Sequence, residues 1–342
     1  MVPGGAAAGS LCARVDGRRE PGAVGELAGA RVLVFGASGF LGRWVARRLS
    51  RTGAELHLAL RDPDRGPALG ELHQVDASDE GQVARLIARV EPAVTFNLAG
   101  YGVGREQRDE RESTLLNAKL PGWIARALAS ARDRGWTGVR LVHAGSGLEY
   151  GAAGGDLRET AECRPATVYG RTKLEGTLAV ARIAPGEGGR TGLRAVVARI
   201  FTVYGAGERP GRLLPSLLAS AEGGGDVPLG PGTQHRDFVF AEDAAEALVR
   251  LALADARPGE IVNLATGRLS SVREFALEAA RILGLDERRL RFGALPSYPE
   301  EMDHDPVNVA RLRELLGGSP DPDLRAGLER AIAGARAPER LA

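Results

Sequence analysis

The chain has few of the residues that mark several classes of protein. Its 2 cysteines among 342 residues, Cys12 and Cys163, lie far apart, so neither a disulfide framework nor a Cys/His metal site is expected. No apolar run reaches the roughly 18–20 residues of a membrane span, and the first residues lack the apolar segment of a signal peptide. The 45 basic residues nearly cancel the 44 acidic ones, so no global charge attracts nucleic acid or an anionic membrane. We therefore expect a cytoplasmic protein with no bound metal and no nucleic-acid or membrane partner.

The pattern from residue 31 onward predicts an α/β fold. Short apolar runs alternate with helix-like segments, which is typical of a parallel sheet with crossover helices. We expect a Rossmann-type, doubly wound parallel sheet, followed by a smaller C-terminal substrate-binding domain. The predicted strands lie at 31–35, 56–60, 72–75, 93–98, 139–143 and 195–200, and the predicted helices at 40–52, 81–90, 113–131, 168–183, 213–222, 241–254 and 272–283.

Three glycines follow the first predicted strand. The segment Gly36-Ala-Ser-Gly-Phe-Leu-Gly42 joins that strand to the next helix, so backbone N–H groups at a helix N-terminus can face a pyrophosphate. Alone, this spacing would also suit a tight strand-to-helix turn, but between a strand and a helix it predicts a dinucleotide site. The residues expected to line it are Gly36, Ser38, Gly39, Phe40, Leu41 and Gly42.

Residues at the ends of the next strands help to predict whether NADP or NAD binds. Arg61 stands where NAD-binding chains carry an acid, and a guanidinium there can pair with the 2′-phosphate of NADP. We predict NADP as the preferred cofactor and NAD as the alternative, because Asp62 serves the ribose if the register differs by one or two residues. Asp76, with its neighbour Ala77, is expected to contact adenine. After the fourth strand, the expected contacts with the nicotinamide ribose are Leu98, Ala99 and Gly100.

Two residues four positions apart predict proton-transfer chemistry. Tyr169 and Lys173 lie on one face of a predicted helix. A free phenol has a pKa of about 10, and a nearby ammonium is expected to lower the pKa of Tyr169 toward the range of efficient proton transfer. Lys173 stands out because lysine is scarce in this chain. Ser146, just past the fifth predicted strand, can donate a hydrogen bond to a substrate oxygen that changes its charge.

Together these features resemble the extended short-chain dehydrogenase/reductases, in particular their NAD-dependent epimerase/dehydratase branch, from about residue 31 to residue 316. The resemblance implies that Ser146, Tyr169 and Lys173 are catalytic, with Tyr169 as acid/base and Lys173 also holding the nicotinamide ribose. The matching elements are Gly36-x-x-Gly39-x-x-Gly42, Asp76, Asn97-Leu-Ala99, the loop 146–151, Tyr169-Gly-Arg-Thr-Lys173, Arg199-Ile-Phe-Thr-Val-Tyr-Gly205 and Arg236-Asp-Phe-Val.

The resemblance also divides the chain. Residues 1–27, rich in Gly and Ala, are expected to be a disordered extension or the result of a start codon placed too early. Residues 28–200 should form mainly the NAD(P)-binding domain with the catalytic residues, and residues 201–335 mainly the substrate-binding region. In many relatives, the helices that correspond to 113–131 and 168–183 form a four-helix seam between two subunits. A homodimer is therefore expected.

A nucleotide-diphosphate sugar is the substrate that the resemblance implies. Arginine suits such a ligand because its planar fork grips phosphate bidentately. The family often has Asn where this chain has Thr202, whose side chain is shorter. The expected substrate contacts are Ser146, Thr202, Arg212, Leu214 and Arg236.

Several functions fit these residues. A sugar 4,6-dehydratase needs an acid close after the catalytic hydroxyl residue. Here Gly147 and Leu148 follow Ser146, and the nearest acid, Glu149, lies one position beyond the place where the dehydratase pattern has it, which disfavours this function. A non-catalytic NADP sensor is disfavoured because Tyr169 and Lys173 are both present. We therefore expect a 4-ketoreductase of a nucleotide-linked 4-keto-6-deoxysugar that uses exchangeable NADPH. The alternative is a 4-epimerase that retains NAD.

Overall fold

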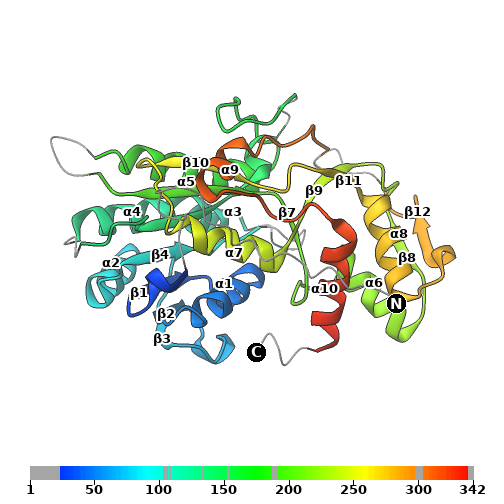
Figure 1. Ribbon diagram of the computed structural model, residues 1–342, viewed down its shortest axis with the longest axis horizontal. Coiled ribbons are helices and arrows are strands. Elements are labelled where there is room, and N and C mark those ends of the chain that lie inside the picture. Colours follow the sequence, from blue (N-terminus) through cyan, green and yellow to red (C-terminus); the bar gives the residue numbers. More distant parts are fainter. Residues whose placement is uncertain are drawn as a thin grey trace, which may run out of the picture.

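The computed structural model describes residues 24–102, 107, 109–131, 135–151, 155–186, 192–296 and 303–337. In this part of the chain, seven parallel strands form one sheet with helices on both faces (Figure 1). The predicted doubly wound α/β fold is confirmed. The strands, in their order across the sheet, are β10 (Glu260–Leu264), β6 (Ala195–Ile200), β5 (Leu141–Ser146), β4 (Val94–Asn97), β1 (Arg31–Phe35), β2 (Glu55–Leu60) and β3 (Glu71–Gln74).

The apolar runs of the sequence become the centre of this sheet. Nearly every side chain of β1, β4, β5 and β6 is buried, as expected of a parallel sheet that is covered on both faces. The strand order reverses beside β1, since β2 and β3 extend from it in one direction and β4, β5 and β6 in the other. Ligands of doubly wound sheets bind beyond the carboxyl ends of the strands at such a reversal. This edge is therefore the expected ligand site.

Two layers of helices cover the sheet. One face packs against α1 (Phe40–Ser50) and α7 (Ala241–Leu251), which contact each other. The other face packs against α2 (Glu80–Val90), α4 (Leu120–Ser130) and α5 (Val168–Ile183). Side-chain caps determine where two of these helices begin: Asp79 accepts a hydrogen bond from the N–H of Gln82, and Thr167 from that of Gly170.

The segment predicted as a helix over 113–131 is helical up to Ser130, but it is not one regular α-helix. The segment consists of α3 (Glu110–Ser113), a π-helical segment η3 (Thr114–Lys119) and α4. Pro121 has no N–H to donate to the carbonyl of Asn117 four residues earlier, which interrupts the regular hydrogen-bond ladder. Gly176 of α5 packs against that carbonyl, since a Cβ there would lie 2.0 Å from its oxygen. The π-helical segment therefore lies directly against α5.

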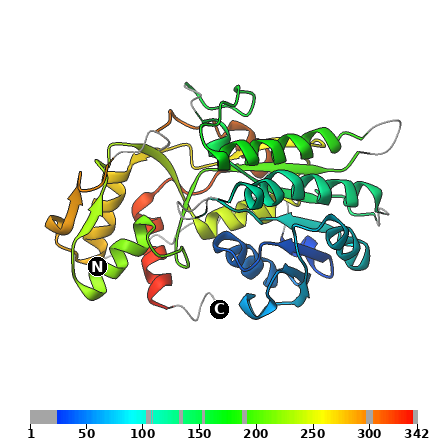
Figure 2. The same cartoon turned by 180° about the vertical axis from the view of Figure 1, so that it is seen from behind.

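The chain after β6 forms a smaller unit and also returns to the main sheet. Figures 1 and 2 show this unit at one end of the molecule, beside the main sheet. The sequence did not predict β10, which adds an edge strand to the main sheet beside β6. The remaining strands are β7 (Thr202–Tyr204), β9 (His235–Phe240) and β11 (Leu269–Ser271) in a three-stranded sheet, and the pair β8 (Val227–Leu229) and β12 (Leu290–Phe292). The remaining helices are α6 (Leu213–Gly223), α8 (Val272–Leu283), α9 (Ala310–Leu316) and α10 (Leu324–Arg336), and the short 3-10 turns are η1 (Val24–Leu27), η2 (Pro63–Arg65), η4 (Gly147–Glu149) and η5 (Glu287–Arg289).

The last four residues of the predicted N-terminal extension form a short 3-10 turn. Residues 1–23, Cys12 among them, lie outside the described residues. The first described element is η1, whose last residue, Leu27, is fully buried against the core. None of the helices in the described part of the chain combines the length and the apolar character needed to cross a bilayer.

Candidate active site

The glycine loop after β1 leaves room for a dinucleotide. Gly36 has a φ of +83°, and a Cβ there would lie 2.5 Å from the backbone nitrogen of Ala99. A Cβ on Gly42 would lie 2.0 Å from the carbonyl oxygen of Gly36. α1 begins after Gly39 without a side-chain cap, which leaves the N–H groups of its first turn for an anion. The loop therefore fits the predicted pyrophosphate. Of the other predicted loop residues, Ser38 is exposed, and Phe40 and Leu41 are partly buried.

The predicted adenosine contacts lie at the ends of β2 and β3. Arg61 follows β2, its side chain is 66% exposed, and its Nη2 lies 3.3 Å from Oε2 of Glu112. The sequence did not single out Glu112, because it is one of several charged residues in its segment and nothing in the pattern pairs it with Arg61. Asp76 accepts hydrogen bonds from the hydroxyl and the N–H of Ser78, at 2.7 and 2.9 Å, and these bonds lower its pKa. Asp62, the alternative ribose ligand, caps η2 instead.

The loop after β4 approaches Lys173 closely. A Cβ on Gly100 would lie 3.3 Å from the Nζ of Lys173, so a glycine permits this approach. Asn117 of η3 fastens the loop: its Oδ1 accepts from the N–H of Tyr101 at 3.0 Å, and its Nδ2 donates to the carbonyl of Tyr101 at 2.7 Å and to Oγ1 of Thr172 at 3.0 Å. The sequence analysis missed Asn117, whose only signal is a polar residue in an apolar helical stretch. The other two residues predicted for this loop, Leu98 and Ala99, are partly buried, as is Ala77, which was predicted beside Asp76.

Three side chains meet where β5 ends beside α5. Ser146 is the last residue of β5, which runs beyond its predicted end at 143, and Tyr169 and Lys173 lie one turn apart on α5. The Nζ of Lys173 donates to the carbonyl oxygen of Ala144 at 2.8 Å and lies 6.0 Å from the centre of the Tyr169 ring. The fold thus brings together the three residues predicted to be catalytic.

Burial is the largest influence on the pKa values of Lys173 and Tyr169. It lowers the pKa of Lys173 to about 8, against the negative charge of Glu149, which raises it. Burial raises the pKa of Tyr169 to about 12, while a hydrogen bond with Ser146 and the charge of Arg212 lower it. The expectation that Lys173 lowers the pKa of Tyr169 toward neutrality is therefore wrong, because desolvation of the phenolate dominates and the ammonium is directed at a backbone carbonyl. Near pH 7, Tyr169 is a neutral phenol.

Glu149 is fully buried in a hydrogen-bonded ion pair. Its Oε1 accepts from the N–H of Ser146 at 2.7 Å and from Oγ1 of Thr177 at 2.9 Å. Its Oε2 accepts from Nε of Arg199 at 2.9 Å, and the Arg199 side chain is only 3% exposed. A carboxylate with these three partners is not free to remove a proton from a substrate. Glu149 therefore positions Ser146, and the structure gives a second reason to disfavour the dehydratase.

The predicted substrate residues lie on α6, β7 and β9. Arg212 immediately precedes α6, and its charge lowers the pKa of Tyr169, so its guanidinium lies near the catalytic trio. Thr202 begins β7, Arg236 lies in β9, the two strands pair, and both side chains are partly buried. Leu214 is 1% exposed within the core, which leaves only its backbone for a ligand.

A dinucleotide loop and a Ser–Tyr–Lys trio at the carboxyl edge of a doubly wound sheet define an NAD(P)-dependent oxidoreductase. Residues 32–265 match the model of the NAD dependent epimerase/dehydratase family. The chain belongs to this family, which confirms the resemblance found in the sequence and the prediction of an NAD(P)-dependent enzyme.

Three known proteins illustrate the similarity. The chain is 33% identical over 309 residues to a dTDP-6-deoxy-L-talose 4-dehydrogenase (NAD(P)(+)) of Kitasatospora kifunensis, an alignment that covers 86% of this chain and 92% of the relative. It is 29% identical over 322 residues to a dTDP-4-dehydro-6-deoxy-D-allose reductase of a Streptomyces species, with 88% and 95% covered. Among solved structures, MoeE5 in complex with UDP-glucose and NAD has a TM-score of 0.78 and 27% identity, with 90% of this chain and 99% of MoeE5 covered.

We expect Tyr169→Phe to lower turnover by roughly 10²–10⁴-fold and to leave nucleotide binding nearly unchanged, because only the proton-transfer group is lost. Lys173→Met should reduce both turnover and nucleotide binding. Steady-state rates and fluorescence titration with the nucleotide measure the two effects. Tyr204→Phe, which removes another buried phenol outside the trio, is the control. Near-normal turnover of Tyr169→Phe would show that another group transfers the proton.

Proposed function

We propose that this chain is an NADPH-dependent reductase that acts on the C4 ketone of a nucleotide-diphosphate 4-keto-6-deoxysugar. The observation that carries the proposal is the placement of Tyr169, a neutral phenol beside the hydroxyl of Ser146. A ketone oxygen gains negative charge as it is reduced, so a reductase needs a proton donor at that oxygen. The names of the two relatives in the functional comparison also describe redox chemistry at position 4 of dTDP-linked 6-deoxysugars, which makes dTDP the first nucleotide to test.

In the proposed reaction, the hydroxyls of Ser146 and Tyr169 bind the C4 oxygen of the substrate. Oγ of Ser146 accepts a hydrogen bond from the N–H of Leu148 at 3.2 Å. Its own proton, which otherwise serves the hydrogen bond with Tyr169, is then donated to the substrate oxygen. Tyr169 transfers its proton to the oxygen as the ketone becomes an alcohol. When bound, NADPH supplies the hydride. Lys173, oriented by a carbonyl of β5, binds the ribose and places positive charge near the phenolate that Tyr169 leaves behind.

The 4-epimerase is the alternative function. It requires Tyr169 to accept a proton from the C4 hydroxyl before it returns one. The neutral phenol of Tyr169 fits the return of the proton, a step that the epimerase shares with the reductase, but not the first step. The distinction between the two functions rests on whether the cofactor is consumed.

We expect the purified protein to consume NADPH in a one-to-one ratio with a nucleotide-linked 4-keto-6-deoxysugar and to release the oxidised cofactor readily. A reductase must exchange its cofactor on every turnover, whereas an epimerase regenerates it. The absorbance of reduced nicotinamide measures the consumption, and chromatography of the nucleotide sugars measures the product. Interconversion of two 4-epimers without added cofactor, and with no net change in that absorbance, would replace the reductase by the epimerase.

For the cofactor, we propose that NADP is preferred over NAD. Support comes from Arg61, an exposed guanidinium at the end of β2 whose charge also lowers the pKa of Asp76. Its present partner is the carboxylate of Glu112, at 3.3 Å. A surface ion pair of this kind contributes little free energy, so a phosphate dianion can take its place.

Arg61→Ala should weaken the binding of NADPH by roughly 10–100-fold and that of NADH much less, because a charge-assisted hydrogen bond to phosphate is lost only in NADPH. Glu112→Gln should shift the preference further toward NADPH, since it frees Arg61 and removes a negative charge. Arg51→Ala, at the far end of α1, is the control. If titration shows that the Arg61 variant loses equal affinity for both cofactors, Arg61 is not the group that recognises the 2′-phosphate.

We further propose a homodimer, formed through α4 and α5, in the cytoplasm, where exchangeable NADPH and nucleotide sugars are supplied. Leu178 of α5 is 44% exposed, and a hollow along the two helices is lined by Trp123 and by charged side chains such as Glu175 and Arg182. An exposed leucine beside a tryptophan, with charged side chains around them, suits an interface between subunits.

Leu178→Glu should shift the protein from dimer to monomer in sedimentation experiments, because a carboxylate would be buried in the seam. Leu295→Glu replaces a leucine that is similarly exposed, at 42%, but lies outside α4 and α5, and should leave the dimer intact. A wild-type protein that sediments as a monomer at all concentrations would contradict the proposal.

A further inference from the structure

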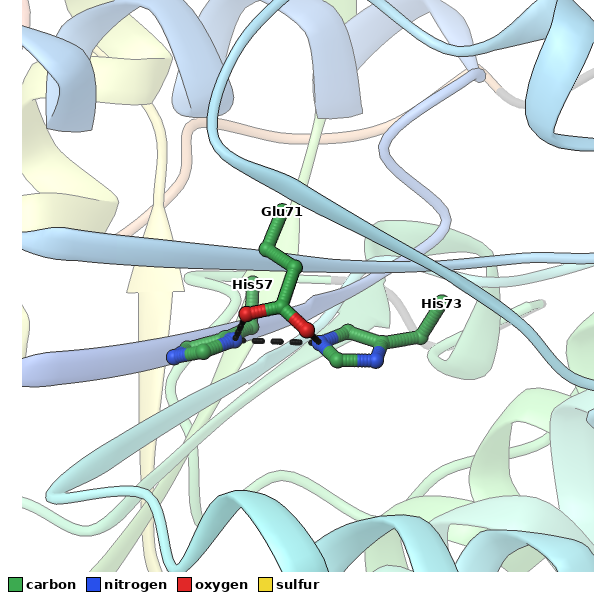
Figure 3. Close-up of side chains that lie close together, drawn as sticks. All are labelled: His57, Glu71 and His73. Atoms are coloured by element: carbon green, nitrogen blue, oxygen red, sulfur yellow. Dashed lines mark hydrogen bonds and ion pairs between the residues drawn. The ribbon is translucent and has the colours of Figure 1, made fainter.

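A cluster of two histidines and a glutamate lies on the strands at one side of the main sheet. β3 is the edge strand and β2 is its neighbour. His57 of β2 pairs with Glu71 of β3, and His73 follows two residues later, so the three side chains point to one face of the sheet. Figure 3 shows the carboxylate of Glu71 reaching toward the facing nitrogens of both imidazole rings.

The facing atoms of this cluster are spaced like the ligands of a metal ion. Nδ1 of His57 lies 3.0 Å from Nε2 of His73. The two oxygens of Glu71 lie 3.4 Å from Nδ1 of His57 and 3.6 Å from Nε2 of His73. Ligand atoms of a tetrahedral zinc ion are about 3.3 Å apart, since its bonds to nitrogen and oxygen are roughly 2.0–2.1 Å long. The two imidazole nitrogens are close to that spacing, and each oxygen of Glu71 is close to it from one of the two nitrogens. One ligand atom from each residue lies within 4.8 Å of the other two.

Exposure differs among the three side chains of this cluster. The side chains of His57 and His73 are 14% and 8% exposed, whereas that of Glu71 is 66% exposed. Imidazole nitrogens and carboxylate oxygens are groups through which proteins ligate zinc. The exposed carboxylate supplies negative charge and leaves the cluster open to solvent on its side.

We propose that His57, Glu71 and His73 bind one divalent transition-metal ion of the zinc type, with solvent completing its coordination. The ion joins β2 to the edge strand β3 through side chains, in addition to the backbone ladder. Arg61 and Asp76 follow the ends of the same two strands, so the bound ion stiffens the sheet where adenosine is expected to lie. The sequence analysis predicted no metal because it looked for cysteine, whereas these ligands come from two neighbouring strands.

The first experiment measures binding to the full-length chain, purified without a histidine tag and freed of metal with a chelator. Titration with Co²⁺ should saturate at one ion per chain and give the intensified visible absorption of a four- or five-coordinate site, and Zn²⁺ should displace the Co²⁺. Zn²⁺ should also raise the melting temperature, because an ion that binds the folded state stabilises it, whereas Mg²⁺ should not. An absence of saturable binding would overturn the proposal and leave the 3.0 Å contact as a hydrogen bond between two imidazoles.

The second experiment tests which residues hold the ion. Glu71→Gln changes an exposed side chain, so it should fold normally and weaken Zn²⁺ binding by at least the roughly 10–100-fold that follows the loss of an outer-shell partner. His73→Gln should weaken it further. His235→Gln is the matched control, because His235 also faces a carboxylate, that of Asp303 at 3.6 Å, but belongs to no such cluster among the described residues. Equal affinity of the wild type and the Glu71 and His73 variants would place the ion elsewhere and refute the site.

Discussion

The buried ion pair between Glu149 and Arg199 is the constraint on which the catalytic edge depends. The carboxylate connects three elements, since it accepts hydrogen bonds from Ser146 at the end of β5, from Thr177 of α5 and from Arg199 of β6. An unpaired buried charge is costly, so loss of either partner of such a pair typically costs about 3–5 kcal/mol. The pair therefore fixes the end of β5 relative to the helix that carries Tyr169. It also explains why an acid so close to Ser146 serves the structure and not the chemistry.

Binding and chemistry occupy different parts of the same sheet edge. The groups expected to recognise adenosine follow β2 and β3, where the His57–Glu71–His73 cluster also lies. The groups proposed to transfer the proton are at the end of β5 and on α5. Asn117 connects the loop after β4 to α5 through the hydrogen bonds of its amide. The carbonyl of Asn117, in the π-helical turn, also packs so closely on α5 that a side chain at Gly176 would collide with it. A change at Asn117 is therefore expected to move the loop after β4 relative to α5.

Features with a strong local signal could be predicted from the sequence. The starts of β1, α1, α5 and β6 follow from apolar runs and from the glycine motif, and spacing alone paired Tyr169 with Lys173. Features that depend on contacts between distant parts of the chain could not be predicted in this way. β10 is a short run whose partner, β6, lies far back in the chain, and the π-helical turn reflects Pro121 together with packing on α5. The role of Glu149 depends on Arg199, which is 50 residues away in the sequence.

The pKa of Tyr169 could not be predicted from its spacing to Lys173 in the sequence. Its position relative to Lys173 suggested a phenol made acidic by a neighbouring ammonium. In the folded chain, desolvation acts on both groups, raising the pKa of the phenol and lowering that of the ammonium. Both shifts favour the neutral form of the group. A neutral phenol is a proton donor, and an ammonium whose pKa is about 8 still carries its charge near pH 7 and can stabilise the phenolate once the proton has left. The site therefore holds a proton donor and a cation side by side, which are the two forms that the proposed reduction needs.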